Sequence, residues 1–149
     1  AHGEHQREAI WKNRRVLSES LRRLHPKKIS EDVVVPRSAI PEAIARFKAI
    51  GAEAGLMVAT YGHAGDGNLH ANVLYDADEQ LPKVEACVEA IVRAALELGG
   101  TITGEHGVGL AKASFLPWEQ DAATIELQRH LKRVFDPQGI LNPGKIFPA

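Results

Sequence analysis

Cysteine is almost absent from this chain: Cys87 stands alone among 149 residues. A single cysteine excludes an internal disulfide and any cysteine-rich metal site. Because Cys87 falls among Val84, Val88 and Ile91 at helical spacing, we expect an inert thiol in the core. No signal peptide is visible. Together these absences favour a reducing, cytoplasmic compartment.

An excess of charge of one sign and long apolar runs are also lacking. The formal net charge is -1 and the lysines and arginines are scattered, so nothing indicates a nucleic-acid partner. No apolar run approaches the roughly 18 residues that a membrane span needs. We therefore expect neither a nucleic-acid-binding nor a membrane-spanning protein.

The motifs of several enzyme classes are missing as well. Both glycine clusters, at residues 62–67 and 104–109, read GxxGxG, the reverse of the spacing in the dinucleotide fingerprint. A P-loop lysine and a GxSxG nucleophile motif are absent. The sequence therefore lacks the usual motifs of acyl-transfer and phosphoryl-transfer enzymes.

Helical and extended patterns alternate regularly along the chain. We expect helices at residues 5–24, 38–54, 81–98 and 118–135, and strands at 31–37, 56–61, 68–75 and from 101 to 103. The central order is β-α-β-β-α-β, the ferredoxin-like split βαβ arrangement. The predicted fold class is α+β: an antiparallel sheet with both central helices on one face, plus an N-terminal helix, a C-terminal helix and a tail.

The length fits a single domain that occupies residues 1–149. Because the chain opens at Ala1 rather than Met, inside a helical pattern, we expect a fragment of a longer protein. The tail from residue 136 holds three prolines and two glycines among few polar residues. This composition predicts an ordered, extended segment that packs against something.

Two glycine-rich segments carry the chemistry: His63 and His70 in YGHAGDGNLHA, and Glu105 with His106 in TGEHGVGL. Imidazole and carboxylate groups bind Zn²⁺, Mn²⁺ or Fe²⁺, and two histidines with one glutamate leave coordination positions open for catalysis. Strand alternation places His70 and Asn72 on the face without helices. Glu105 and His106 are adjacent, so we expect Glu105 to be a ligand and His106 to face the substrate.

Other interpretations of these residues stay open. A lone histidine in a strand is more often hydrogen-bonded structure than a ligand. A flavin-free metal-binding module, a metal-dependent hydrolase, or an interaction domain of ferredoxin-like shape could each carry the same residues. The combination of two histidines with Asn72 and with a glycine-flanked Glu-His pair favours a binding site over isolated structural residues.

Three separated motifs carry a specific resemblance: YGHAGDGNLHANVLY, TITGEHGVGLAK and VFDPQGILNPGKIF. From about residue 11 to 147 the chain resembles the C-terminal half of FAD-linked oxidases of the vanillyl-alcohol-oxidase superfamily, in the branch of D-lactate, glycolate and D-2-hydroxyglutarate dehydrogenases. The resemblance implies a substrate or cap domain whose FAD is held mainly by a separate N-terminal domain. Alone, this chain should hold FAD poorly.

Residue by residue, the resemblance implies one divalent metal, zinc or manganese, held by His63, His70 and Glu105. It implies a base at His106 and a polar substrate contact at Asn72. Arg14 matches an arginine that meets the substrate carboxylate, Ser18 lies one helical turn later and can join it, and Asn142 is the residue expected to approach the flavin.

The implied reaction is oxidation of a small 2-hydroxy acid. The metal acts as a Lewis acid on the C2 hydroxyl, His106 removes its proton, and hydride passes from C2 to the flavin. In the 2-hydroxyglutarate branch a lysine precedes the DxxxP of the strand; Ser30 occupies that place here, with Lys27 and Lys28 just upstream. This departure counts against a dicarboxylate substrate without excluding it. A homodimer is compatible with the sequence, which does not determine the oligomeric state.

Overall fold

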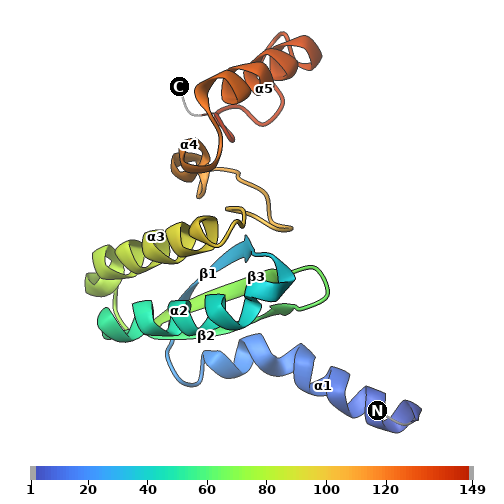
Figure 1. The fold of residues 1–149 in the computed structure, drawn as a ribbon, viewed down its shortest axis with the longest axis vertical. Helices are drawn as coiled ribbons and strands as arrows, with labels where there is room; N and C mark the ends of the chain where they lie inside the picture. The colour runs from blue at the N-terminus through green and yellow to red at the C-terminus, as the bar shows by residue number, and fades with distance from the viewer. Residues whose placement is uncertain (1–2, 148–149) are drawn as a thin grey trace.

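The computed structural model describes residues 3–147 (Figure 1). Its helices are α1 (Glu4–Leu21), α2 (Ile40–Glu53), α3 (Leu81–Glu97), α4 (Leu116–Glu119) and α5 (Ala122–Phe135). Its strands are β1 (Lys27–Val34), β2 (Met57–His63) and β3 (Asn68–Tyr75). Short 3₁₀ turns at Arg37–Ala39, Asp78–Gln80 and Ala113–Phe115 lead into α2, α3 and α4. The fold class is α+β, as the sequence predicts.

The sheet is antiparallel in the order β1-β3-β2, so β3 lies at its centre. The predicted fourth strand is reduced to a single bridge between Thr101 and Val34 at the outer edge of β1. Of the following backbone N–H groups, that of Ile102 donates to the Glu119 carboxylate and those from Gly104 to His106 donate to the carboxylate of Asp32. Side chains therefore end the ladder that the sequence pattern predicts.

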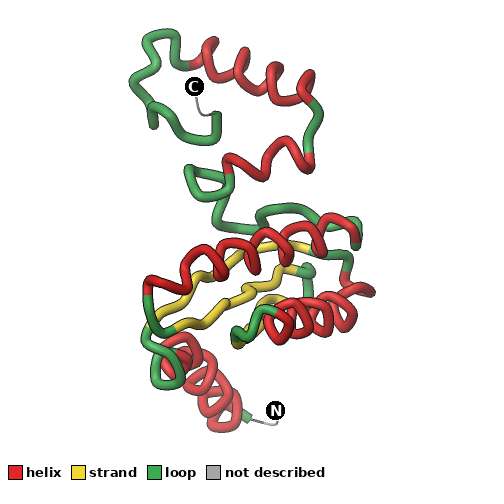
Figure 2. The backbone as a smooth tube through the Cα atoms, turned by 90° about the vertical axis from the view of Figure 1, so that its left-hand side faces the viewer, coloured by secondary structure: helices red, strands yellow, loops and turns green. Residues whose placement is uncertain are grey.

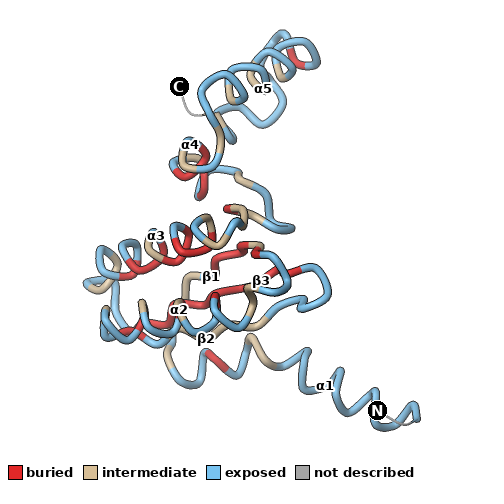
Figure 3. The backbone as a smooth tube through the Cα atoms, in the orientation of Figure 1, coloured by how far each residue is buried: buried red, intermediate tan, exposed pale blue. Residues whose placement is uncertain are grey.

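Helices α2 and α3 pack on one face of the sheet, which confirms the prediction that both central helices share a face (Figures 1 and 2). Along α2 the buried residues are Ala43, Phe47 and Gly51, a spacing of four that makes one apolar stripe. They join the alternate residues of β3 and the buried side of α3 in one core. Figure 3 shows this burial along β1, β3 and α3.

The opposite face of the sheet is less open than the sequence suggests. Strand β3 is buried along its whole length, and on this face the side chains of His70 and Asn72 are almost inaccessible. Helix α1 accounts for part of this cover, because Ser18 and Arg14 contact side chains of this face. The helix reaches the end where Leu74 lies, whereas His63 stays exposed at the hairpin end.

The predicted helix at residues 118–135 is broken into α4 and α5. Gln120 adopts an extended conformation, and Asp121 begins α5 by accepting a hydrogen bond from the backbone N–H of Thr124 at 2.7 Å. An N-cap aspartate inside a continuous apolar pattern thus starts a new helix. The tail folds back because the Asp136 carboxylate accepts hydrogen bonds from the N–H groups of Ile140 and Leu141.

Helix α5 and the tail stand apart from the sheet, and most of their residues are exposed (Figures 1 and 3). One backbone hydrogen bond, from Ile146 N–H to the Gly109 carbonyl at 2.7 Å, ties the tail to the glycine-rich segment after His106. Between residues 3 and 147 no helix is long and apolar enough to cross a membrane.

Candidate metal and substrate site

The side chains opposite the core helices form a polar face, and the strand register decides which of them meet. His70 on β3 pairs with Asp32 on β1 and with Tyr61 on β2, and Asn72 pairs with Ser30 and Ala59. In antiparallel pairs the two side chains point to the same face. Asp32, His70 and Tyr61 therefore form a row across the sheet near the hairpin that carries His63.

Glu105 lies at the centre of the predicted ligand cluster. Its Oε1 is 3.1 Å from His70 Nε2 and 3.7 Å from His63 Nε2. Its distance to His106 Nε2 is 4.0 Å. The rings of His63 and His70 meet edge to face, with centroids 5.7 Å apart, and those of His70 and His106 are stacked at 5.2 Å. The structure thus brings together all four residues that the sequence singles out.

The spacing of three donor atoms fits one metal ion. Ligand atoms of His63, His70 and Glu105 all lie within 4.8 Å of one another. Two ligands about 2.0–2.1 Å from a tetrahedral zinc ion are roughly 3.3 Å apart. The two nitrogen–oxygen distances to Glu105, 3.1 and 3.7 Å, bracket that value. A divalent ion would need only small side-chain adjustments here.

His70 is held in the form that a metal ligand requires. Burial lowers its pKa below the ordinary value of histidine, against the opposing pull of Asp32 and Glu105, and nearby His106 and His63 lower it further. A neutral imidazole is the metal-binding form. Its Nδ1 lies 4.0 Å from Asp32 Oδ1 while its Nε2 points to Glu105, so the two ring nitrogens face different partners.

Asp32 is a site residue that the sequence analysis does not identify. This buried carboxylate accepts hydrogen bonds through Oδ2 from the N–H groups of Gly104, Glu105 and His106, at 2.8 to 3.0 Å. Thr103 Oγ1 also donates to Oδ2, and Asn68 donates to Oδ1. Consecutive backbone N–H groups around an anion make a nest. Asp32 therefore fixes the backbone of the two residues that complete the cluster.

Asp32 is the weaker candidate for a metal ligand, although its oxygens lie near His70 and His106. Burial alone would raise its pKa, but hydrogen bonds from His106 N–H, Asn68, Gly104 N–H and Thr103 hold that pKa well below its usual range. Five donors already engage this carboxylate, four of them at Oδ2 and Asn68 at Oδ1. The cluster of His63, His70 and Glu105 is the better metal site.

The close packing around Asp32 requires glycine at position 104. A Cβ atom there would lie 1.9 Å from Asn68 Nδ2 and 2.9 Å from Asp32 Oδ1. No side chain fits at that distance, so the nest needs a residue without one. The sequence signal for this contact was the acidic pair Glu31 and Asp32 directly before the three valines of the expected strand.

A second group of polar side chains lies further along the same face, where α1 crosses the sheet. Lys28 Nζ donates to Ser18 Oγ at 2.7 Å and to Asn72 Oδ1 at 3.1 Å. Tyr61 OH donates to the same Asn72 oxygen at 3.4 Å, and the Arg14 guanidinium carbon lies 5.8 Å from the Tyr61 ring centroid. The predicted residues Arg14, Ser18 and Asn72 are thus brought to one surface.

Lys28 is a functional candidate that the sequence analysis noted only as lying just upstream of Ser30. It stands two residues before Ser30, so both side chains project to the same face of β1. Its ammonium group reaches Asn72, the residue opposite Ser30 in the register. Although Ser30 replaces the lysine of the 2-hydroxyglutarate branch, Lys28 two positions earlier still presents a lysine on this face.

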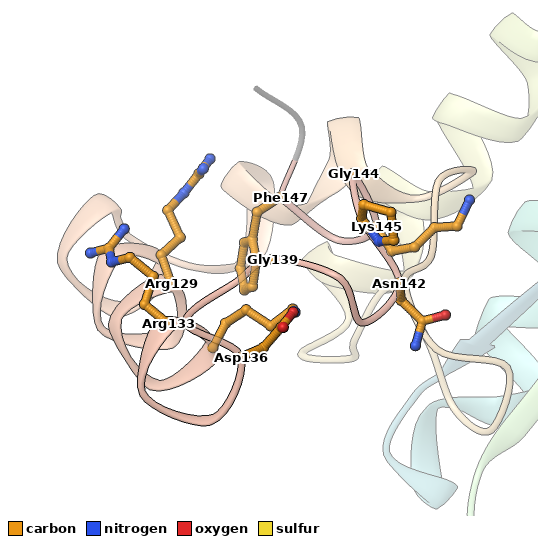
Figure 4. Close-up of a pocket in the computed structure, with 10 residues that line it drawn as sticks. Arg129, Arg133, Asp136, Gly139, Asn142, Gly144, Lys145 and Phe147 are labelled. Carbon is orange, nitrogen blue, oxygen red and sulfur yellow. The ribbon is translucent and has the colours of Figure 1, made fainter.

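Asn142 lies elsewhere, on the tail beside α5 (Figure 4). It is exposed and adopts a left-handed conformation, with φ of 48°. Ile146 is also left-handed, with φ of 66°, a strained backbone conformation for a β-branched side chain. Asn142 lines a hollow of about 250 Å³ together with Lys145 and basic residues of α5. The chain does not bring Asn142 to the histidine cluster.

Comparison with known proteins places these features in one family. Residues 1–146 match the family of FAD linked oxidases, C-terminal domain. The chain is 43% identical to the glycolate oxidase subunit GlcD of Bacillus subtilis over 93% of its length, and 36% identical to D-2-hydroxyglutarate dehydrogenase of Stutzerimonas stutzeri over 98%. It is 44% identical to the mitochondrial D-lactate dehydrogenase [cytochrome] of Kluyveromyces lactis over 78%.

The relatives are much longer than this chain. The matched region covers 30% of the Bacillus subtilis protein, 32% of the Stutzerimonas stutzeri protein and 20% of the Kluyveromyces lactis protein. The similarity thus concerns one part of each relative, and the family match over residues 1–146 includes the histidine cluster and most of the tail. The chain belongs to the FAD-linked oxidases and corresponds to their C-terminal domain.

Proposed function

We propose that this chain is the substrate- and metal-binding part of an FAD-dependent D-2-hydroxy acid dehydrogenase. The observation that carries the proposal is the convergence of His63, His70 and Glu105 beside a face that also presents Arg14 and Lys28. The names of the relatives, which are a glycolate oxidase subunit and dehydrogenases of D-2-hydroxyglutarate and D-lactate, support the substrate class.

His63, His70 and Glu105 are the residues that would hold a divalent ion, zinc or manganese. Such an ion supplies Lewis acidity that lowers the pKa of a hydroxyl group and stabilises the developing negative charge. The chain contributes the geometry: β3 positions His70 from a buried strand, and the Asp32 nest positions Glu105 from the opposite side. His63 enters from the exposed hairpin end of β2.

His106 is the proposed base for the substrate hydroxyl. Its ring stacks on His70, and its side chain is half exposed, so it borders the space in front of the cluster. Its backbone is fixed by the hydrogen bond from its own N–H to Asp32 at 2.9 Å. Proton removal by a positioned side chain contributes about 10²–10⁴-fold to a rate.

The carboxylate of the substrate is proposed to meet the cations at the α1 end of the face. Arg14 offers a planar guanidinium suited to a carboxylate, and Lys28 offers a second, point-like charge held by Ser18 and Asn72. Two cations of different kinds could serve one carboxylate or the two ends of a dicarboxylate. A small 2-hydroxy acid is therefore the proposed class, with chain length set on this face.

The flavin is proposed to come from an N-terminal FAD-binding domain outside the 149 residues. Among the described residues, Asn142 is the proposed contact with that flavin. The exposed apolar side chains on α5 and the tail would then lie against that domain, and residues 1–149 would form its substrate and cap domain. A cytoplasmic location, supported by the single buried thiol of Cys87, stays a prediction.

A flavin-free metal module or hydrolase is the competing function, and a reconstitution experiment separates them. The chain is combined with the flavin-binding domain of a relative such as the Bacillus subtilis protein, and bleaching of the flavin absorbance is followed after addition of D-lactate, glycolate or D-2-hydroxyglutarate. We expect bleaching with at least one acid, and strong loss in the Arg14→Ala variant. Metal binding without any bleaching by the wild-type pair would favour the metal module instead.

A further inference from the structure

Lys112 closes the segment that carries Glu105 and His106. Its side chain is buried, and its ammonium group donates to the carbonyl of Ile102 at 2.8 Å and to the backbone carbonyl of Asp32. The first bond joins the two ends of residues 102–112, and the second ties that closed segment to β1. Lysine is almost never fully buried unless its charge is paired.

The surroundings of Lys112 are arranged for a buried positive charge. Its Nζ lies 3.6 Å from Glu31 Oε2 and 3.9 Å from Asp32 Oδ2. Burial lowers the pKa of Lys112, and the two carboxylates act against that shift. Glu31 Oε2 is buried and accepts no hydrogen bond among the described residues. The pair therefore balances charge without a direct hydrogen bond, whereas the carbonyl contacts are directional.

Glu105 has little else to define its place. Its side chain is 54% exposed, and the partners of its carboxylate within 4.0 Å among residues 3–147 are the three histidines of the cluster. Its position thus depends on its backbone, which Asp32 holds through one oxygen. Lys112 fixes the backbone of Asp32 itself, one covalent step from that carboxylate.

We propose that Lys112 is a positioning residue for the metal centre. Through the carbonyls of Asp32 and Ile102 it sets the segment that places Glu105 and His106 against the strand histidines. This inference rests on the proposed function, because it assigns Lys112 a purpose at the proposed metal site. It concerns a side chain that contacts neither metal nor substrate.

The test compares Lys112→Met with Lys48→Met, a lysine on the exposed side of α2. Methionine keeps the length of the side chain and removes the donor. Zinc affinity of the chain is measured by competition with a chromophoric chelator, and thermal unfolding of the metal-free protein is followed in parallel. We expect affinity to fall by about 10–100-fold in Lys112→Met, as for other residues that orient metal ligands, and to stay unchanged in Lys48→Met.

A double variant separates positioning from charge balance and protects the test against misfolding. Glu31→Gln combined with Lys112→Met removes both charges, so the uncompensated carboxylate is gone and metal-free stability should recover relative to Lys112→Met. Zinc affinity should stay low, since the two carbonyl contacts are still missing. If the double variant binds zinc like the wild type, Lys112 acts only by neutralising Glu31 and the proposal is wrong.

Amide hydrogen exchange at residues 104–106 gives a second readout that needs no metal. These amides donate to Asp32, so we expect them to exchange on the order of tenfold faster in Lys112→Met and in the double variant. Unchanged exchange would overturn the positioning role. If wild-type protein fails to bind zinc while the exchange result holds, the proposed metal function fails and the structural role of Lys112 survives.

Discussion

The hairpin end of the sheet and the C-terminal region differ in whether their side chains find partners within the chain. At the hairpin end, a charged residue as buried as Asp32 has all its hydrogen-bond partners within the chain. In α5 and the tail, large apolar side chains such as Phe135, Val134 and Ile140 are mostly exposed. In the first region the buried Asp32 carboxylate is satisfied within the chain, whereas the second has an apolar surface of the kind that marks an interaction site.

The difference teaches which part of the proposed active site this chain supplies. The histidine cluster needs only residues that the chain folds together. Asn142, the proposed flavin contact, lies in the region whose apolar surface is exposed, and both Asn142 and Ile146 are left-handed. Strained backbone at a site persists where surrounding structure holds it. We therefore propose that the chain supplies the cluster of His63, His70 and Glu105 for a metal, and that another domain completes the flavin site.

The largest effect that would sharpen this comparison is expected at His106. In the reconstituted enzyme, His106→Ala should lower the rate of flavin reduction by about 10²–10⁴-fold, the usual contribution of a general base. Zinc content should stay near that of the wild type, since Glu105 remains. Rapid-mixing absorbance gives the rate and elemental analysis the metal content. Reduction within a few-fold of wild type would remove His106 from the chemistry.

The next largest effect concerns stability, and it allows the same Phe→Ala change to be compared in the core and in the C-terminal region. Phe47 is fully buried between α2 and the sheet, so Phe47→Ala should destabilise the chain by about 3–5 kcal/mol. Denaturant unfolding of the chain alone measures this value. A loss below about 1 kcal/mol would mean that the core does not pack as described.

The smallest effect is expected for the matching change in the C-terminal region. Phe135 is 80% exposed, so Phe135→Ala should change the stability of the chain alone by no more than about 0.5 kcal/mol. Its effect should instead appear as weaker association with the flavin-binding domain, measured by titration calorimetry. Unchanged association would show that this surface does not face that domain.

The residues that sequence reasoning identified are those whose placement depends on local pattern. Strand alternation put His70 and Asn72 on one face, and the glycines around Glu105 marked it as a loop residue near that face. In the structure His63, His70 and Glu105 come together, and Asn72 lies two residues from His70 on the same face of β3. The structure confirms the two core helices on the other face, because their apolar spacing is a property of short windows of sequence.

The parts that sequence reasoning missed depend on contacts between distant segments. Asp32 meets residues 104–106 across more than seventy positions, and Lys112 reaches Asp32 across eighty. No local pattern encodes such a pairing, and it also explains why the fourth strand was predicted wrongly. The broken helix at Asp121 was missed for a different reason: the apolar period runs through it, and only the cap contact reveals the start of α5.

The most direct test of the account is the metal content of the chain and its dependence on Glu105. Purified chain is loaded with zinc, freed of excess ion by dialysis, and measured by elemental analysis beside Glu105→Gln and Glu53→Gln, an exposed glutamate at the end of α2, the helix on the other face of the sheet. We predict close to one zinc per chain in the wild type and in Glu53→Gln, and little in Glu105→Gln. Equal zinc in all three proteins, or none in the wild type, would contradict the account.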